Sequence, residues 1–208
     1  MRPLAGAKHK HFAKAECFCF WYTLIMKVYF ITGNARKVGE AKLACESAGI
    51  EIVQQQVEID EIQSTNPNAI SIDKAEKAYN LVNKPLVVTD SFWRIPALNG
   101  FPGAYMKDVA NWFSSEDFLS LMEKKENRQI FFSENITYKD NEIIKQFSQE
   151  YEGTIVTEPR GIGNSIENVA EFEGFTLGER REQGGYSHKP EDYVWNDFVK
   201  WIKQKQPD

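Results

Sequence analysis

Residues 27–37 read KVYFITGNARK, an apolar run that ends in a turn. The run from Val28 to Ile31 is β-branched, aromatic or aliphatic, which predicts a buried strand. Thr32-Gly33-Asn34 is typical turn chemistry. Apolar residues at positions 38, 41, 43, 44 and 48 then give one face of a helix that Gly49 would end. With a second strand over residues 51–57, this stretch predicts a β-loop-α-β unit.

The rest of the chain adds elements of both kinds. We predict a helix over residues 69–82 with Pro67 near its start, a strand over residues 86–89, a loop over residues 90–105 and a helix over residues 112–122. Two antiparallel strands over residues 129–138 and 143–157 and a final helix over residues 190–203 follow. Because no internal repeat or low-complexity linker interrupts the pattern, we predict a single two-lobed α/β domain.

Composition limits the classes of function. The chain has 208 residues, 42% of them hydrophobic, which suffices for a proper core. Its formal net charge of -5 argues against a nucleic-acid polymer as partner, because such partners are bound through large basic surfaces. The three cysteines, Cys17, Cys19 and Cys45, form neither a zinc-finger pattern with histidine nor a disulfide framework, so we expect a reducing, cytoplasmic location.

The first 25 residues differ from the rest. Basic residues such as Lys10 precede an apolar run from Cys17 to Met26, which imitates a signal peptide. The run is shorter than the roughly 20 residues that span a bilayer, and no small-x-small cleavage site follows it. We therefore interpret residues 1–25 as an N-terminal extension or an overextended start and residues 26–208 as the domain, with no membrane partner.

The turn from Thr32 to Lys37 is a candidate phosphate site. Free backbone N–H groups and the positive end of a helix favour an anion at such a position, and Lys37 adds a full charge. Gly33 lets the backbone come close, and Thr32 and Asn34 can donate side-chain hydrogen bonds. A purely structural turn is the alternative, since the GxxxxGK[ST] pattern of a P-loop is absent.

Carboxylates follow the second and third predicted strands. Glu61 lies in the acidic segment 58–61, and Asp90 with Ser91 follows residues 86–89. Ligands of open α/β sheets bind outside the carboxyl ends of strands, so the two acids could hold Mg²⁺ together, although each alone could be a solvated loop residue. Ser187-His188-Lys189 forms a late basic cluster, and no GxSxG elbow supports a catalytic triad.

Five motifs in a fixed order resemble one family. They are TGNxxK at residues 32–37, DEIQ at 60–63, DS at 90–91, ALNGxPGxY at 97–105 and SHK at 187–189. In these the chain resembles the inosine triphosphate pyrophosphatases, house-cleaning enzymes for non-standard purine nucleotides. The resemblance implies an elongated mixed β-sheet between two lobes with flanking helices and a homodimer. It also implies Mg²⁺-dependent hydrolysis of nucleoside triphosphates such as ITP, XTP and dITP to monophosphate and pyrophosphate.

The resemblance also implies roles for individual residues. Triphosphate binding is implied for Thr32, Asn34, Lys37 and Lys74, and the nucleotide contacts extend to Ser91, Ser187, His188 and Lys189. Glu61 and Asp90 would hold Mg²⁺, and Asp90 would activate the attacking water while the cations neutralise the phosphates. Residues 101–105 would form a rigid loop beside the site.

Departures from the family pattern concentrate in the base pocket. Ile162 and Ser165 stand where the family has an aromatic residue and an acid, Gln183 replaces a lysine, Lys189 replaces an arginine, Thr89 replaces a carboxylate and Phe92 a glycine. Fewer polar base contacts predict an altered or relaxed base preference. Thr89 also leaves open a non-catalytic nucleotide-binding protein. The aromatic residues Tyr193, Trp195 and Trp201 leave open a protein-interaction module.

Overall fold

One mixed sheet organises the computed structural model, which describes residues 26–185 and 193–205. Within these residues the eight strands run in the order β2-β1-β3-β5-β6-β7-β8, with β4 paired to β3. Their bounds are β1 Met26–Ile31, β2 Ile50–Gln55, β3 Leu86–Arg94, β4 Pro102–Gly103, β5 Gln129–Lys139, β6 Ile144–Ile155, β7 Ala170–Phe172 and β8 Phe175–Thr176. β1 pairs in parallel with β2 and β3, and the other pairs are antiparallel.

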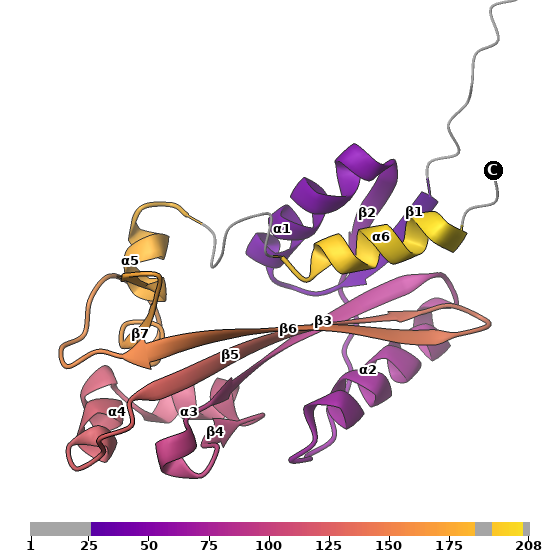
Figure 1. Cartoon of the computed structure of the whole chain (residues 1–208). Helices are drawn as coiled ribbons and strands as arrows, with labels where there is room; N and C mark the ends of the chain where they lie inside the picture. The colour runs from indigo at the N-terminus through magenta and orange to yellow at the C-terminus, as the bar shows by residue number, and fades with distance from the viewer. Residues whose placement is uncertain (1–25, 186–192, 206–208) are drawn as a thin grey trace, which may run out of the picture.

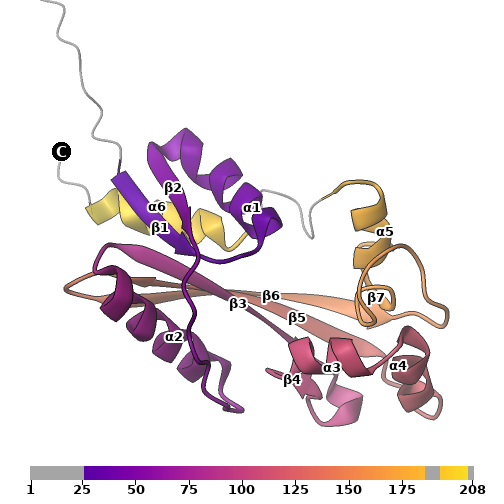
Figure 2. The same cartoon turned by 180° about the vertical axis from the view of Figure 1, so that it is seen from behind.

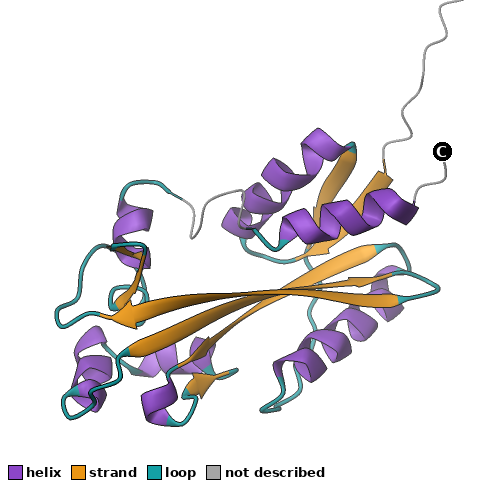
Figure 3. Ribbon diagram, viewed as in Figure 1, coloured by secondary structure: helices purple, strands orange, loops and turns teal. Residues whose placement is uncertain are grey.

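Helices cover the sheet at both ends. They are α1 Ala35–Cys45, α2 Pro67–Val82, α3 Met106–Trp112, α4 Ser115–Met122, α5 Leu177–Glu182 and α6 Trp195–Lys205, with 3-10 turns η1 Glu46–Ala48 and η2 Pro96–Leu98. Figures 1 and 2 show α1 and α6 on one face and α2 on the other at one end of the sheet, while α3, α4 and α5 gather at the far end. The long strands β3, β5 and β6 run between these two lobes (Figure 3).

Local chemistry sets the limits of the first two helices. The Asn34 side chain caps α1, and Gly49, with φ of 74°, ends the following 3-10 turn in the left-handed conformation that glycine adopts readily. The Asn66 side chain caps α2, and Pro67 occupies its first turn, where no N–H is needed. These elements lie where the sequence predicts them.

In the described residues the core divides into three clusters. One cluster packs α1 and α6 on the sheet and includes Phe30 and Trp195, whose rings lie 5.3 Å apart and nearly perpendicular. A second joins α2 to β3, and a third joins α3 and α4 to the far ends of β5 and β6. The aromatic residues of the final helix therefore serve the core: Trp195 is 4% exposed and Phe198 is fully buried.

The structure corrects several expectations about the secondary structure. The third strand does not end at Thr89: β3 continues to Arg94 because β5 pairs with it along its whole length, from Leu86↔Lys139 to Arg94↔Phe131. The expected helix over residues 112–122 corresponds to α4, which starts only at Ser115 because Ser114 makes a capping box, and a separate helix that was not predicted, α3, ends at Trp112. Strands β7 and β8 and helix α5, none of which the sequence predicts, occupy residues 170–182.

The final helix starts later than expected. Tyr193 and Val194 precede it, α6 begins at Trp195, and residues 186–192 lie outside the described part of the chain. In residues 26–185 and 193–205, no helix combines the length and the apolar composition needed to cross a membrane.

Candidate functional site

The turn between β1 and α1 is held by its own side chains. Asn34 Oδ1 accepts hydrogen bonds from the backbone N–H groups of Arg36, at 3.0 Å, and Lys37, at 3.4 Å. The backbone N–H of Asn34 donates to Thr32 Oγ1 at 3.1 Å, and Gln54 Nε2 donates to the Thr32 carbonyl at 3.0 Å. The amide oxygen of Asn34 is thus used in the cap, which leaves its NH₂ group as the part able to meet an anion.

A charged cluster lies across from this turn. Lys74 Nζ, on α2, is 2.8 Å from Asp90 Oδ1 and 2.8 Å from Glu61 Oε1. Ser71, one turn earlier on α2 and 1% exposed, donates from Oγ to Asp90 Oδ2 at 3.0 Å. Side chains of α2 therefore hold both oxygens of the Asp90 carboxylate. Three segments of the chain meet at Lys74: α2 itself, β3 and the connection between β2 and α2.

Electrostatics keep this cluster charged. Burial by itself lowers the pKa of Lys74, but Asp90 and Glu61 outweigh it and raise the pKa above its usual 10.5. Burial raises the pKa of Glu61, but Lys74, Lys107 and Lys37 outweigh it and bring the pKa below 4.5. At Lys37 burial prevails and lowers the pKa, although Glu134 and Asp90 act in the opposite direction.

One cavity of about 1080 Å³ contains the turn and the cluster. Its lining includes Thr32, Asn34, Lys37, Glu61, Lys74, Asp90 and Ser91. Pockets that hold small-molecule ligands have volumes of the order of several hundred Å³, so the cavity has room for a nucleotide. The other three candidate residues, Ser187, His188 and Lys189, lie outside the described residues.

Asp90 reaches the cavity although it is not at the end of its strand. β1 pairs with β3 only at Tyr29↔Leu86 and Phe30↔Val87, and β1 ends at Ile31. Between Val87 and Trp93, where β4 begins to pair, the edge of β3 that faced β1 has no strand partner, and residues 89–92 line the cavity there. The strand boundary predicted from sequence is wrong, yet Asp90 still lies just past the carboxyl end of the parallel part of the sheet.

Two residues of the site, Lys107 and Ser71, were not indicated by the sequence. Lys107, on α3, lines the cavity with Tyr105 and Ala104 of the 101–105 segment, which was expected beside the site and part of which is strand β4 paired to β3. Lys107 lies two residues after the end of the ALNGxPGxY motif, and this nearness was its available signal. Ser71 carried no signal, because a serine within a helix pattern reads as an ordinary polar position.

Glu134 is a further, partly buried acid beside the site. It lies on β5 opposite Ser91, and with Lys37, Asp90 and Ser91 it lines a second small cavity of about 10 Å³. Burial, followed by the charge of Glu40, raises the pKa of Glu134 to about 7, although Lys37 and Arg36 lower it. Its sequence context, a polar residue within an alternating strand, gave no reason to single it out.

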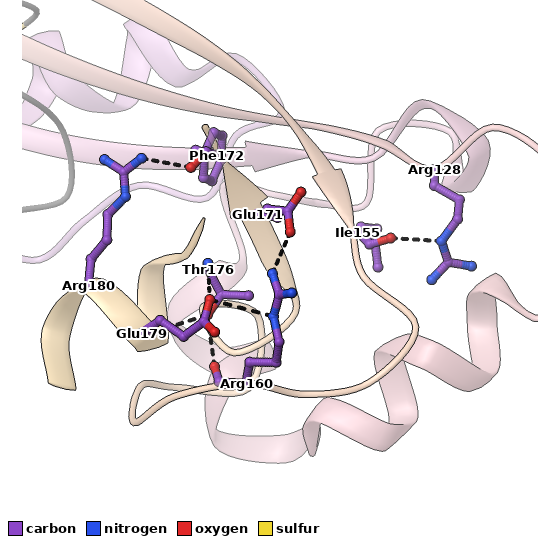
Figure 4. Close-up of polar contacts among 8 residues, drawn as sticks. All are labelled: Arg128, Ile155, Arg160, Glu171, Phe172, Thr176, Glu179 and Arg180. Carbon is purple, nitrogen blue, oxygen red and sulfur yellow. Dashed lines mark hydrogen bonds and ion pairs between the residues drawn. The ribbon is translucent and has the colours of Figure 1, made fainter. Parts of the chain in front are cut away.

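The segment at residues 159–165 is fixed in the far lobe (Figure 4). The Arg160 side chain pairs with Glu171 and Glu179, and Thr176 Oγ1 donates to the Arg160 carbonyl at 2.8 Å. At Gly161, φ is 80° and a Cβ atom would lie 2.0 Å from the Glu179 backbone nitrogen, so only glycine fits. This packing leaves Ile162 69% exposed at the tip of the segment.

Neighbouring arginines extend this network in Figure 4. Arg128 Nε donates to the Ile155 carbonyl at 2.7 Å, and Arg180 donates to the Phe172 carbonyl at 2.6 Å.

Ile162, Ser165 and Gln183, the positions that depart from the family pattern, are absent from the lining of the large cavity, whereas Thr89 and Phe92 belong to it.

The acids of the site suit an ion shared with a substrate. Among the described residues no group of three or more His, Cys, Asp and Glu could hold a metal alone. Mg²⁺ is usually bound by one or two carboxylates together with substrate phosphates. Glu61 Oε1 and Asp90 Oδ1 each lie 2.8 Å from the same Lys74 nitrogen, so they cannot be further apart than twice that distance. These two oxygens fit such a shared ion.

Taken together, the fold and the cavity define an α/β protein in which a capped strand-to-helix turn shares a cavity with a lysine–carboxylate cluster. Comparison with known proteins gives the family: the profile of the Ham1 family matches residues 28–165. The chain belongs to the Ham1 family, which confirms the resemblance found in the sequence.

Individual relatives and structures agree with this assignment. The chain is 32% identical over 183 residues to the dITP/XTP pyrophosphatase of Methanosarcina acetivorans, covering 86% of this chain and 98% of that protein. It is 33% identical over 154 residues to the inosine triphosphate pyrophosphatase of Yarrowia lipolytica, covering 73% and 81%. The Ham1 protein from Coxiella burnetii matches its fold with a TM-score of 0.73 at 20% identity, over 86% of this chain and 99% of that one. The predicted mixed α/β fold is thereby confirmed.

Proposed function

We propose that this chain hydrolyses nucleoside triphosphates to nucleoside monophosphate and pyrophosphate, removing non-standard substrates such as ITP, XTP and dITP. One observation supports this above all: the phosphate-binding turn and the Lys74–Asp90–Glu61 cluster face a single cavity of about 1080 Å³. The names of the relatives, dITP/XTP pyrophosphatase and inosine triphosphate pyrophosphatase, agree with it.

The turn and two lysines would bind the triphosphate. The hydroxyl of Thr32 and the NH₂ group of Asn34 donate to phosphate oxygens, and the positive end of α1 favours the anion beside them. Lys37 and Lys74 approach from opposite sides of the cavity and neutralise charge that builds up on the phosphates in the transition state. Ser91 lines the same cavity, and Ser187, His188 and Lys189 complete the nucleotide contacts in this proposal.

Asp90 would activate the water. The water oxygen bonds to phosphorus on one side of the α–β bridge, the bridging oxygen leaves with the phosphate group on the other side, and the water proton passes to Asp90. The hydrogen bond from Ser71 to Asp90 Oδ2 orients the carboxylate for this transfer. Glu61 and Asp90 would hold Mg²⁺, which supplies charge neutralisation at the phosphate oxygens.

The base preference, the assembly and the location are part of the same proposal. An exposed Ile162 on a glycine-bounded segment offers apolar contact without hydrogen bonds, which supports an altered or relaxed choice of base. The homodimer follows from the family resemblance and the cytoplasmic location from the sparse cysteines. Action on free nucleotides rather than on a nucleic-acid polymer agrees with the negative net charge of -5.

Pyrophosphate release from a panel of nucleotides tests the proposal. The panel contains ITP, XTP, dITP, the common NTPs and modified pyrimidine dNTPs, each measured with Mg²⁺ and with EDTA. Metal-dependent release from the purine analogues is expected, and the order of bases reports the preference. A folded protein that releases no pyrophosphate but is thermally stabilised by nucleotides would be a non-catalytic binder, the class that Thr89 leaves open.

A further inference from the structure

The cation at the centre of the site is the ammonium group of a protein side chain, Lys74. Lys74 Nζ lies at the same distance, 2.8 Å, from one oxygen of Glu61 and one of Asp90. The side chains of Lys74 and Asp90 are 16% and 13% exposed, and that of Glu61 is 48% exposed. One ammonium group thus occupies the space between the two carboxylates that fit a divalent ion.

An ammonium and a divalent ion exclude each other from this space. Mg²⁺ binds carboxylate oxygens at about 2.0–2.1 Å, so an ion held by both carboxylates would lie almost where the ammonium now lies. Two cations a few ångströms apart in a partly buried site also repel each other strongly. Divalent metal can therefore reach both carboxylates only after Lys74 has moved away.

We propose that Lys74 is a built-in competitor for divalent metal, which occupies the position between Glu61 and Asp90 until an anionic ligand draws it away. Lys74 lines the same cavity as Thr32 and Lys37, so an anion bound at the turn offers the ammonium a new partner. The identity of that anion as a nucleoside triphosphate rests on the proposed function, whereas the competition rests on the three side chains alone.

The surroundings support a movement of the lysine rather than of the acids. Asp90 stays in place without Lys74, since Ser71 donates to its other oxygen at 3.0 Å. Glu61 is half-exposed on the connection between β2 and α2, where a carboxylate can turn toward an ion. A long lysine side chain anchored on α2 can sweep several ångströms without any change of backbone.

Metal titration without nucleotide tests this competition. Mg²⁺ alone and Mn²⁺ alone are titrated by calorimetry into the full chain and into Lys74→Met, Lys74→Gln and Lys74→Arg. Removal of the ammonium charge is expected to tighten Mn²⁺ binding at least about tenfold in the first two variants, because the competitor is gone and both carboxylates remain. Lys74→Arg keeps a cation in place and is expected to bind metal as weakly as the natural chain.

Lys77→Gln is the matched control. Lys77 is on the same helix, pairs with Asp73 at 2.8 Å and donates to the Asp60 carbonyl at 2.7 Å, but it has no contact with Glu61 or Asp90 in the described structure. The substitution removes one positive charge and one contact with the segment between β2 and α2. Its metal affinity is expected to stay within about twofold of that of the natural chain. Thermal melts identify folded variants, and either neutral substitution alone suffices for the comparison.

Two results would overturn the competition. One is unchanged or weaker Mn²⁺ binding by a folded Lys74→Met or Lys74→Gln variant. The other is an equal gain in Mn²⁺ affinity in Lys77→Gln, which would mean that the gain comes from the change in net charge and not from the removal of a competitor. Neither readout uses nucleotide or turnover. If the chain releases no pyrophosphate but the Lys74 variants bind metal more tightly, the proposed function is refuted and the competition stands. If the chain releases pyrophosphate but the variants do not bind metal more tightly, the competition is refuted and the proposed function stands.

Discussion

At Asp90, two hydrogen bonds from α2 hold a carboxylate that β3 positions at the wall of the cavity. An isolated aspartate in a strand would be free to rotate, but Ser71 holds Oδ2, and Lys74 holds Oδ1 in the ligand-free structure. This orientation is what a general base needs, since proton transfer depends on geometry before acidity. The role of Asp90 therefore depends on α2 as much as on its own position.

Asp90→Asn is expected to lower turnover by more than about tenfold, because an amide can neither take the water proton nor neutralise a metal. Asparagine still accepts the Ser71 hydrogen bond, so the fold should persist. Pyrophosphate release measures the first effect and thermal unfolding the second. Asp73→Asn, which alters the acid paired with Lys77 on the same helix, is the control. Full activity in the Asp90 variant would remove Asp90 from the mechanism.

Glu134 gives the free energy of unfolding a pH dependence. Its pKa is raised from 4.5 to about 7 in the folded protein, so it stabilises the fold below about pH 4.5 relative to higher pH, and this contribution is lost as pH rises through 7. Glu134→Gln lacks the titration. The stability of the variant relative to the natural chain is therefore expected to rise by about 1–3 kcal/mol between pH 5 and pH 8.

Urea unfolding of both chains across this pH range measures the difference. Glu158→Gln, a change in the segment before Arg160 and outside both cavities, is the control for the loss of one carboxylate charge. A flat difference for Glu134→Gln would mean that its carboxyl is not desolvated as the structure describes.

At the scale of elements, α1 and α2 are both capped by an asparagine side chain, and the two caps serve different purposes. Asn34 accepts from the N–H groups of Arg36 and Lys37 at the turn before α1, and Asn66 accepts from the Asn68 N–H at 3.0 Å before α2. Both caps satisfy N–H groups that the helix itself cannot. The Asn34 cap also shapes the turn beside the cavity.

Asn34→Ala and Asn66→Ala form a matched pair. Each is expected to cost about 1 kcal/mol of stability, because each removes a helix cap. Asn34→Ala should in addition raise KM several-fold, since it loosens the turn and removes a donor to the phosphates, whereas Asn66→Ala should leave KM nearly unchanged. Chemical denaturation and steady-state pyrophosphate release separate the two effects. Equal KM values in the two variants would contradict the role of the turn.

The sequence pattern predicted an element well where nearby residues define both ends of that element. The β1–α1–β2 unit and α2 agree with expectation because strand periodicity, asparagine caps and Gly49 act within a few residues. β3 was predicted too short because the Asp90-Ser91 pair reads as a turn, and only pairing with β5 keeps it extended. The short strands β7 and β8 were missed because two or three residues carry no periodic signal.

At the scale of the whole molecule, the described fold begins at Met26, whose backbone N–H donates to the Gly49 carbonyl at 3.3 Å. A chain that starts at Met26 retains every contact of the described core. It is expected to match the full chain in thermal stability within a few degrees and in pyrophosphate release within about twofold. A large loss in either measurement would mean that residues 1–25 belong to the working protein.

Sequence alone determined the β-loop-α-β unit, the turn at residues 32–37 and the ordered motifs that indicate the family. These depend on residues close in the chain, where turn chemistry and apolar periodicity act directly. Tertiary structure decided the contacts of Lys74 with Asp90, 16 residues away, and the burial of Glu134 beside Lys37. Such contacts depend on strand register and helix packing, which are set by the free energy of the whole core, so no local pattern in the chain contains them.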